Sequence, residues 1–293
     1  MNTRSLSLAA LTMLDVPPPD QVRIAAKTGF THVGLRLLPA TPTDPDYDML
    51  GDTATVRETL AALRETGVRV SDVEIVRLTP DFNLEALHTF LETSARLEAQ
   101  QVLVAGNDEN VTRCAENLAR LAQAGKQYGL TMNLEPMPWT AVKTVHDAQT
   151  VITASGQNNV GILVDAIHFW RAGESLTTLA DIPAAQLNYM QLCDAPAQMP
   201  DTTDELIYQA RSARKVPGEG GLDLRGLLAA LPATIPVSLE VPLAGTQGAL
   251  PAHQRAQLLF NAAQSFLGLT HPLNRYGTDS TPGRQRVNQY PAT

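Results

Sequence analysis

The sequence predicts an α/β protein, a closed (β/α)8 barrel in one domain, and three observations lead to this prediction. Short apolar runs alternate with amphipathic helical patterns along the whole chain. The runs are continuously apolar, which is typical of parallel strands buried on both faces. The 293 residues accommodate a barrel of roughly 250 residues. An open, doubly wound sheet is the alternative, but the early strands lack the GxGxxG turn of a nucleotide-binding sheet.

The number of strands favours the closed form, because eight is the number that closes a barrel of this kind. The first run has the length of the apolar core of a secretion signal, but Asp15 and three prolines follow it without a small-x-small cleavage site, so we expect a buried strand. The expected strands are Ser5–Leu14, His32–Leu38, Arg69–Leu78, Gln101–Ala105, Thr131–Glu135, Gly161–Asp165, Asn188–Cys193 and Pro236–Val241.

Helical patterns lie between these runs. Gly29, Gly67 and Gly129 each end such a pattern and precede a strand, as expected for the left-handed residue that closes a helix. The further expected helices are Ala54–Thr66, Leu84–Ala99, Val111–Tyr128, Val145–Ala154, Leu222–Leu231 and Pro251–Leu267.

Two segments depart from the regular alternation. Ala195–Val216 is polar and poorly periodic, and we expect a long functional loop there. After Leu269 the chain is rich in Pro, Gly, Asn, Gln, Arg and Thr. We therefore expect a catalytic domain over residues 1–269 and a surface tail over 270–293, which is either disordered or, in a homo-oligomer, packed on a neighbouring subunit.

The charge balance excludes some classes of partner. With 22 Lys and Arg against 30 Asp and Glu, the net charge is −8, and no basic cluster suited to nucleic acid is present. No apolar run is long enough to span a bilayer. Cys114 and Cys193 form no disulfide framework, so we expect reduced thiols in a cytoplasmic protein.

Four late strands end in polar side chains: Glu135, Asp165, Gln191 and Glu240. The carboxyl ends of parallel barrel strands open at one face, so these side chains should converge there. Three carboxylates in one partly dry pocket repel each other, and a bound divalent cation resolves that conflict. Oxygen ligands suit Mg²⁺ or Mn²⁺, with Co²⁺ as an alternative. A single carboxylate of this kind is more often a helix cap or ion-pair partner, but four at the same end favour a metal site. Asp194 has the opposite parity to Gln191, which favours a structural role.

Further motifs carry a family resemblance over the barrel, from Leu6 to Leu267. They are Leu134-Glu135-Pro136, Val164-Asp165-Ala-Ile-His168, Gln191-Leu-Cys-Asp194, Pro217-Gly-Glu-Gly220 and Leu239-Glu240-Val241. With them the chain resembles the sugar isomerase/epimerase superfamily, whose xylose-isomerase-like barrels include tagatose/psicose epimerases, inosose isomerases and dehydratases, and 3-dehydroshikimate dehydratases.

The resemblance implies that Glu135, Asp165, Gln191 and Glu240 are metal ligands and that His168 and Arg211 contact substrate. Epimerases of the family usually have His where this chain has Gln191. The Gln-Leu-x-Asp-Ala-Pro form, together with the two loop arginines, is similar to bacterial 3-dehydroshikimate dehydratases.

The implied chemistry is proton abstraction α to a carbonyl, with Glu135 and Glu240 as ligands, one of them doubling as acid or base. His168 is either a base or hydroxyl donor, or a residue that orients Asp165. Planar guanidinium groups suit a carboxylate or phosphate. The expected substrate-binding residues are Arg211, Arg214, Glu74, Asn107 and Arg36, although Arg36 has the alternative of pairing with Glu74.

Three functions follow as hypotheses. The first is a metal-dependent isomerase or epimerase of a small keto sugar or keto-polyol, with a dehydratase of a cyclic carboxylated ketone as its closest variant. The second, a repair nuclease on the same barrel, needs a His-rich zinc cluster that six histidines and an acidic chain do not favour. The third is a non-catalytic binding protein on the same scaffold.

Overall fold

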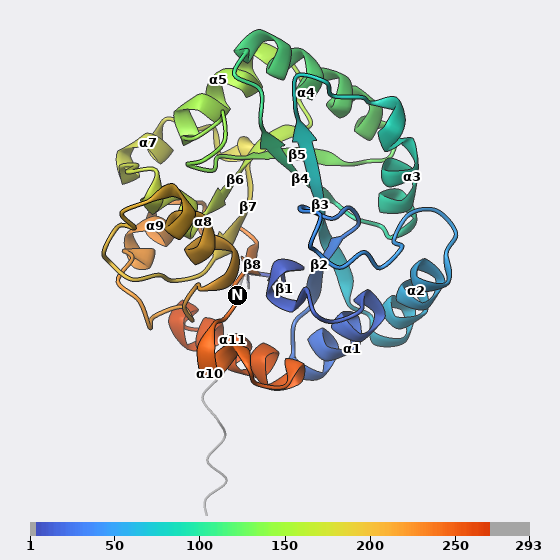
Figure 1. The fold of residues 1–293 in the computed structure, drawn as a ribbon, viewed down its shortest axis with the longest axis vertical. Coiled ribbons are helices and arrows are strands. Elements are labelled where there is room, and N and C mark those ends of the chain that lie inside the picture. The colour runs from blue at the N-terminus through green and yellow to red at the C-terminus, as the bar shows by residue number, and fades with distance from the viewer. Residues whose placement is uncertain (1–3, 270–293) are drawn as a thin grey trace, which may run out of the picture.

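The computed structural model describes residues 4–269, and these form a closed barrel of parallel strands surrounded by helices (Figure 1). Each strand pairs with its neighbours in the sequence, and the last pairs with the first. The predicted (β/α)8 barrel is therefore confirmed, and the open sheet is excluded. The strands are β1 (Leu6–Leu8), β2 (His32–Arg36), β3 (Arg69–Leu78), β4 (Gln101–Gly106), β5 (Thr131–Glu135), β6 (Val160–Asp165), β7 (Leu187–Leu192) and β8 (Val237–Leu239).

Helices cover the outside of the barrel (Figure 1), and the main hydrophobic core lies between them and the strands. Leu35, Val73 and Val104 come from three neighbouring strands and are fully buried in the same cluster as the helical residues Val22 and Leu118. Removing this apolar surface from water is the main stabilising term of the barrel. The helices are α1 (Pro18–Thr28), α2 (Ala54–Thr66), α3 (His88–Arg96), α4 (Val111–Lys126), α5 (Val145–Ser155), α6 (Ala166–Arg171), α7 (Leu176–Ala180), α8 (Thr203–Ser212), α9 (Leu224–Ala230), α10 (Gly245–Gly248) and α11 (Ala252–Leu267), with 3-10 turns η1 (Leu11–Met13), η2 (Glu85–Leu87) and η3 (Ala184–Gln186).

Two helix ends confirm the predicted glycine stops. Gly29 closes α1 with φ 97° and Gly67 closes α2 with φ 72°. Both lie in the left-handed region, which costs little only for glycine. The chain then turns directly into β2 and β3.

The first strand is much shorter than the predicted Ser5–Leu14. Past β1 the Thr12 hydroxyl donates to the Leu239 carbonyl at 2.7 Å and accepts from the Val241 N–H at 2.8 Å. These bonds turn the chain across the end of β8 as η1, so a longer strand is excluded. The sequence stays apolar after β1 because this turn is buried as well.

The predicted loop Ala195–Val216 contains helix α8, which the sequence analysis did not predict. The Thr202 side chain accepts from the Glu205 N–H, and the Glu205 carboxylate accepts from the Thr202 N–H. This capping box is readable as Thr-x-x-Glu. Only Ala210 of the helix is fully buried, so the helix has no apolar stripe from which periodicity could reveal it.

The segment after α8 is fixed to the barrel by Asp194. Asp194 and Lys215 exchange two backbone hydrogen bonds, and the Asp194 carboxylate accepts the backbone N–H groups of Gly218, Gly220 and Leu222. This matches the structural role predicted for Asp194. Among residues 4–269, no helix has both the length and the apolar character needed to cross a bilayer. The predicted tail over 270–293 lies outside the described residues.

We expect Asp194→Ala to lower the free energy of unfolding by about 3 kcal/mol, because several partly buried backbone donors lose their acceptor together. Urea denaturation measures this loss. Asp223→Ala is the matched control: its carboxylate caps α9 through a single bond to the Gly226 N–H, so about 1 kcal/mol should be lost. Equal losses in the two variants would contradict the anchoring role of Asp194.

Candidate active site

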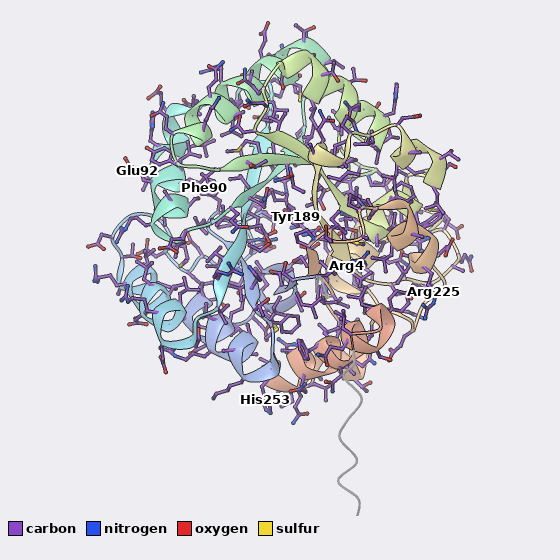
Figure 2. All side chains as sticks on the ribbon, turned by 180° about the vertical axis from the view of Figure 1, so that it is seen from behind. Arg4, Phe90, Glu92, Tyr189, Arg225 and His253 are labelled. Atoms are coloured by element: carbon purple, nitrogen blue, oxygen red, sulfur yellow. The ribbon has the colours of Figure 1, made fainter. Side chains whose placement is uncertain are left out.

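A cavity opens at the carboxyl ends of the strands. Its volume is about 50 Å³, and about 460 Å³ when the space that opens to solvent is included. Glu74, Glu135, His168, Arg214 and Glu240 line it. The floor is apolar: Ile75 and Leu103 line the cavity and belong to a small cluster inside the barrel with Leu163 and Tyr189. Tyr189 lies within the ring of strands in Figure 2.

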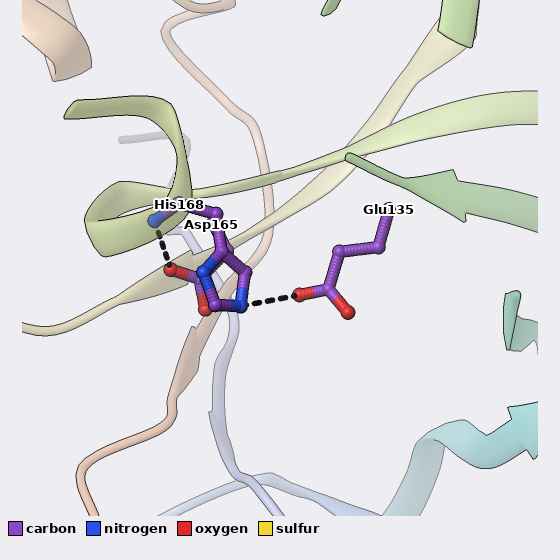
Figure 3. A group of neighbouring side chains, drawn as sticks. All are labelled: Glu135, Asp165 and His168. Carbon is purple, nitrogen blue, oxygen red and sulfur yellow. Dashed lines mark hydrogen bonds and ion pairs between the residues drawn. The ribbon is translucent and has the colours of Figure 1, made fainter. Parts of the chain in front are cut away.

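Glu135, Asp165 and His168 form the tightest cluster of potential ligands, with one ligand atom from each lying within 4.8 Å of the others. Figure 3 shows how local structure sets this geometry. Asp165 ends β6 and caps α6, because its Oδ1 accepts the N–H groups of Ile167 and His168. The first turn of α6 then brings the His168 ring toward Glu135, with Nε2 3.7 Å from Glu135 Oε1.

The other two predicted ligands join this cluster from the neighbouring strands. Gln191 and Ser238 are partners in the β7–β8 register, so Glu240, two residues after Ser238, reaches Gln191 from the end of β8. The Gln191 side-chain N–H donates to Glu240 Oε1 at 2.8 Å. The structure thus gathers the four side chains that the sequence placed at strand ends, although their role as ligands is still a prediction.

Arg214 holds the cluster together. Its Nη1 donates to Asp165 Oδ2 at 2.6 Å, and its Nη2 lies 2.8 Å from Glu240 Oε2. The guanidinium is almost completely buried, with 1% of its side chain exposed. One arginine therefore bridges two of the three carboxylates.

The carboxylates differ in how well the arginine compensates their burial. Burial, followed by the charges of Asp165 and Glu240, raises the pKa of Glu135 well above its usual range. Burial also raises the pKa of Glu240 to about 8, against the opposing effect of Arg214. For Asp165 burial acts in the same direction, but Arg214 and His168 outweigh it and lower the pKa. One arginine therefore does not keep all three carboxyl groups ionised.

The donor set fits a divalent cation. Glu135 Oε1 and Gln191 Oε1 are buried, and neither accepts a hydrogen bond from any residue between 4 and 269. Two orphaned oxygen acceptors, beside buried carboxyl groups that one arginine does not keep ionised, form an environment that a hard cation satisfies. His168 adds a nitrogen in the same cluster, which also suits a borderline cation such as Co²⁺.

His168 is neutral under physiological conditions, because burial lowers its pKa to about 4. Its ring packs edge-on against Trp139, with 4.9 Å between the ring centres, and Trp139 also lines the cavity. A neutral imidazole in this position can accept a proton or donate an N–H to a hydroxyl.

Arg36 and Glu74 pair with each other at the mouth of the cavity. The sequence analysis gave this pairing as the alternative to substrate binding by Arg36. Arg36 Nη2 lies 2.9 Å from Glu74 Oε1, and Arg36 Nη1 lies 2.9 Å from Asp44 Oδ2. Asp44 was not among the predicted site residues, because it lies in an irregular segment between β2 and α2 with no periodic pattern around it. Both predicted residues line the cavity, but each already has a charged partner.

Two other arginines at the cavity are nearly free. Arg77 lines it, forms no ion pair within residues 4–269, and donates only long bonds, 3.3 Å to Asn107 Oδ1 and 3.4 Å to the Ala40 carbonyl. Burial lowers its pKa, followed by the charge of Arg211. Arg211 has one ion-pair contact, 3.8 Å to Asp44. The predicted Asn107 thus touches Arg77 but is not part of the cavity wall. Arg77 was missed, although an arginine inside a predicted buried strand is itself a signal.

Comparisons with known proteins agree with this fold. A family model described as the xylose isomerase-like TIM barrel matches residues 22–261. A stretch of 131 residues is 31% identical to the 3-dehydroshikimate dehydratase of Pseudomonas aeruginosa, and a stretch of 120 residues is 29% identical to the inosose isomerase of Bacillus velezensis. These stretches cover 43% and 40% of this chain, but only 20% and 40% of the two relatives' own lengths.

Solved structures share the architecture at low sequence identity. The IolI protein, determined with a bound zinc atom, has a TM-score of 0.74 at 18% identity, over 90% of this chain and 98% of its own. An L-ribulose 3-epimerase has a TM-score of 0.67 at 14% identity, over 91% of this chain and 95% of its own. At these identities the similarity shows the fold alone.

The low pKa of His168 predicts a pH dependence of stability. Between pH 6.5 and about 4 an unfolded chain binds a proton at this histidine and the folded protein does not. The free energy of unfolding therefore rises with pH across that window. We expect His168 to lower the free energy of unfolding of wild type by about 2 kcal/mol between pH 7 and pH 5. His168→Gln should lack this contribution. Urea denaturation at the two pH values measures the difference. His253→Gln, exposed on α11, should keep the wild-type slope. An unchanged slope in His168→Gln would show that His168 is protonated in the folded protein.

Proposed function

The chain belongs to the xylose isomerase-like TIM barrel family, and on that basis we propose that it is a divalent-metal-dependent enzyme that removes a proton α to the carbonyl of a small polar keto substrate. The first candidate reaction is the isomerisation or epimerisation of a keto sugar or keto-polyol. The observation that carries the proposal is the buried cluster of Glu135, Asp165 and Glu240 around one arginine, at the end of the barrel where such enzymes keep their sites. A non-catalytic protein has no evident need for this costly cluster.

The proposed ligands are Glu135, Asp165, Gln191 and Glu240, with Mn²⁺ or Mg²⁺ as the cation. Their side-chain oxygens are buried, and two of them are orphaned. A divalent cation bound there polarises a carbonyl oxygen and thereby makes the neighbouring C–H acidic enough for a protein base.

Residues of this chain carry out the proton transfers. Glu135 ends β5 and Glu240 follows β8, with β6 and β7 between them, so the two carboxylates face a bound molecule from different sides. One takes the α-proton and the other, or His168, returns a proton to the neighbouring carbon or to the opposite face. The first outcome is isomerisation and the second is epimerisation.

Trp139 and the apolar floor of the cavity support this chemistry by limiting water. Trp139 packs against His168, and Ile75 and Leu103 close the cavity toward the barrel interior. Electrostatic interactions with the developing negative charge are stronger where water is excluded. Trp139, Ile75 and Leu103 thus shape the cavity without supplying a titratable group.

Arg77 and Arg211 favour a second candidate, a dehydratase acting on a cyclic carboxylated ketone. Both lie at the cavity with their charge largely uncompensated, and such guanidinium groups suit a carboxylate. After the α-proton is removed, a β-hydroxyl leaves as water with a proton from a protein acid, and a double bond forms. A relative named 3-dehydroshikimate dehydratase supports this candidate.

Both candidates begin with removal of the α-proton, and exchange with solvent tests that step directly. We expect the Mn²⁺-loaded protein in D₂O to introduce deuterium next to the carbonyl of at least one member of a panel of keto-polyols and cyclic keto acids. Glu135→Gln and Glu240→Gln should slow this exchange at least about 100-fold, because each removes a proton-transfer group. Mass spectrometry measures the incorporation.

Glu219→Gln is the control for this experiment. Glu219 is exposed and its carboxylate contacts Gln247, away from the cavity, so its exchange rate should equal that of wild type. Absence of deuterium in every substrate of the panel, with and without Mn²⁺, would contradict the proposed function.

The two candidates separate on an acidic substrate. If the dehydratase is correct, 3-dehydroshikimate gives the ultraviolet absorbance of protocatechuate. Arg77→Met and Arg211→Met should then each raise KM about tenfold or more, because each removes a charge-assisted hydrogen bond to the carboxylate. The same variants should leave the exchange rate of neutral keto-polyols near wild type. No change in absorbance would leave the isomerase or epimerase as the proposal.

A further inference from the structure

Arg214 was predicted from the sequence to bind substrate, but its contacts indicate another role. A guanidinium has five N–H donors. In Arg214, Nε donates to the Ala210 carbonyl at 2.6 Å, and Nη1 contacts Asp165 Oδ2 at 2.6 Å, the Glu240 carbonyl at 3.2 Å and Cys193 Sγ at 3.4 Å. Nη2 reaches Glu240 Oε2 at 2.8 Å. With 1% of the side chain exposed, little of the guanidinium is open to any other molecule.

The backbone of Arg214 is fixed as firmly as its side chain. The Arg214 N–H donates to the Pro242 carbonyl just after β8, and the next residue, Lys215, exchanges two hydrogen bonds with Asp194 just after β7. The residue is thus held between the ends of two barrel strands. These backbone bonds fix the end of the segment Ala195–Val216, in which the sequence analysis expected a long functional loop.

The partners of Arg214 are two of the four proposed ligands. Asp165 Oδ1 caps α6 and its Oδ2 bonds Arg214, while Glu240 Oε1 accepts from Gln191 and its Oε2 bonds Arg214. The oxygens without a donor lie on Glu135 and Gln191 instead. Positive charge is therefore already supplied on one side of the cluster and missing on the other.

We propose that Arg214 is a positioning residue, a built-in counter-cation that holds the Asp165 and Glu240 carboxylates in place before a metal binds and then shares their neutralisation with it. This inference rests on the metal site of the proposed function. Arg214 and the metal both lower the cost of the same buried negative charge, so either one makes the other less necessary. The effects of arginine and metal on stability are therefore less than additive.

The test is a cycle of arginine substitution and Mn²⁺ addition, with the melting temperature as readout. Wild type and Arg214→Met are stripped with a chelator, dialysed, and melted without and with saturating Mn²⁺. We expect Arg214→Met to melt well below wild type without metal. Its gain on adding Mn²⁺ should exceed the wild-type gain by about 5 °C or more, because the metal supplies charge that the arginine no longer does.

Arg171→Met is the matched control. Arg171 is also a buried arginine, but its Nε donates to Gln209 Oε1 and its Nη2 to the Pro196 carbonyl, both neutral acceptors. This variant should lose the same stability with and without Mn²⁺. Arg214→Lys keeps one charge without the two-pronged geometry, so its Mn²⁺ gain should lie between those of wild type and Arg214→Met; it also serves as the test variant if Arg214→Met does not fold.

The outcomes separate this inference from the proposed function. A wild-type protein that gains no stability from Mn²⁺ overturns the metal site and the inference with it. If the Arg214 variants gain no more stability from Mn²⁺ than wild type, or if Arg171→Met gains as much as Arg214→Met, only the inference is overturned and the metal site stands. A larger gain confined to the Arg214 variants supports both.

Discussion

The structure depends on one electrostatic constraint, the neutralisation of several carboxylates that are buried at the same end of the barrel. Glu135, Asp165 and Glu240 are almost completely inaccessible to water, and burying an ionised carboxylate without compensation is very costly. Arg214 compensates part of this charge, and the caps and amide contacts of the site compensate a further part. Burial still raises the pKa values of Glu135 and Glu240, and the neighbouring carboxylates add to that rise, whereas Arg214 and His168 lower the pKa of Asp165.

The same constraint divides the arginines of the cavity into two groups. Arg36 and Arg214 each bridge two carboxylates, so their positive charge is already paired within the protein. Within residues 4–269, Arg77 forms no ion pair and Arg211 has only a 3.8 Å contact with Asp44, and both line the cavity. A bound anion would therefore meet the second group and not the first. Charge pairing inside the protein thus decides which of four chemically identical side chains is available to a ligand.

The strands and the positions of the strand-end residues could be predicted from the sequence, because continuous apolar runs and a period of one strand and one helix are local signals. The bounds of β3 and β5 agree with the prediction to the residue. Convergence of Glu135, Asp165, Gln191 and Glu240 followed from topology alone, since parallel strands end at one face.

Contacts between side chains of distant segments could not be predicted in this way. The pairing of Arg214 with Asp165 joins residues 49 positions apart, and no local pattern distinguishes it from an exposed loop arginine. Helix α8 was not predicted because it lacks an apolar stripe. The first strand was predicted too long because the turn at Thr12 is as apolar as a strand. In each case a tertiary contact, and not local propensity, decided the outcome.

Helix α8 and the residues after it separate the mouth of the cavity from its buried interior. Arg211 belongs to the last turn of the helix, and Arg214 follows it by three positions, yet the first is partly exposed at the mouth and the second is sealed inside. The change from exposed to buried occurs where the backbone of Arg214 and Lys215 begins to form hydrogen bonds with Pro242 and Asp194, just after β8 and β7. Substitutions before residue 213 would therefore change the mouth of the cavity and leave the contacts of Arg214 with Asp165 and Glu240 in place.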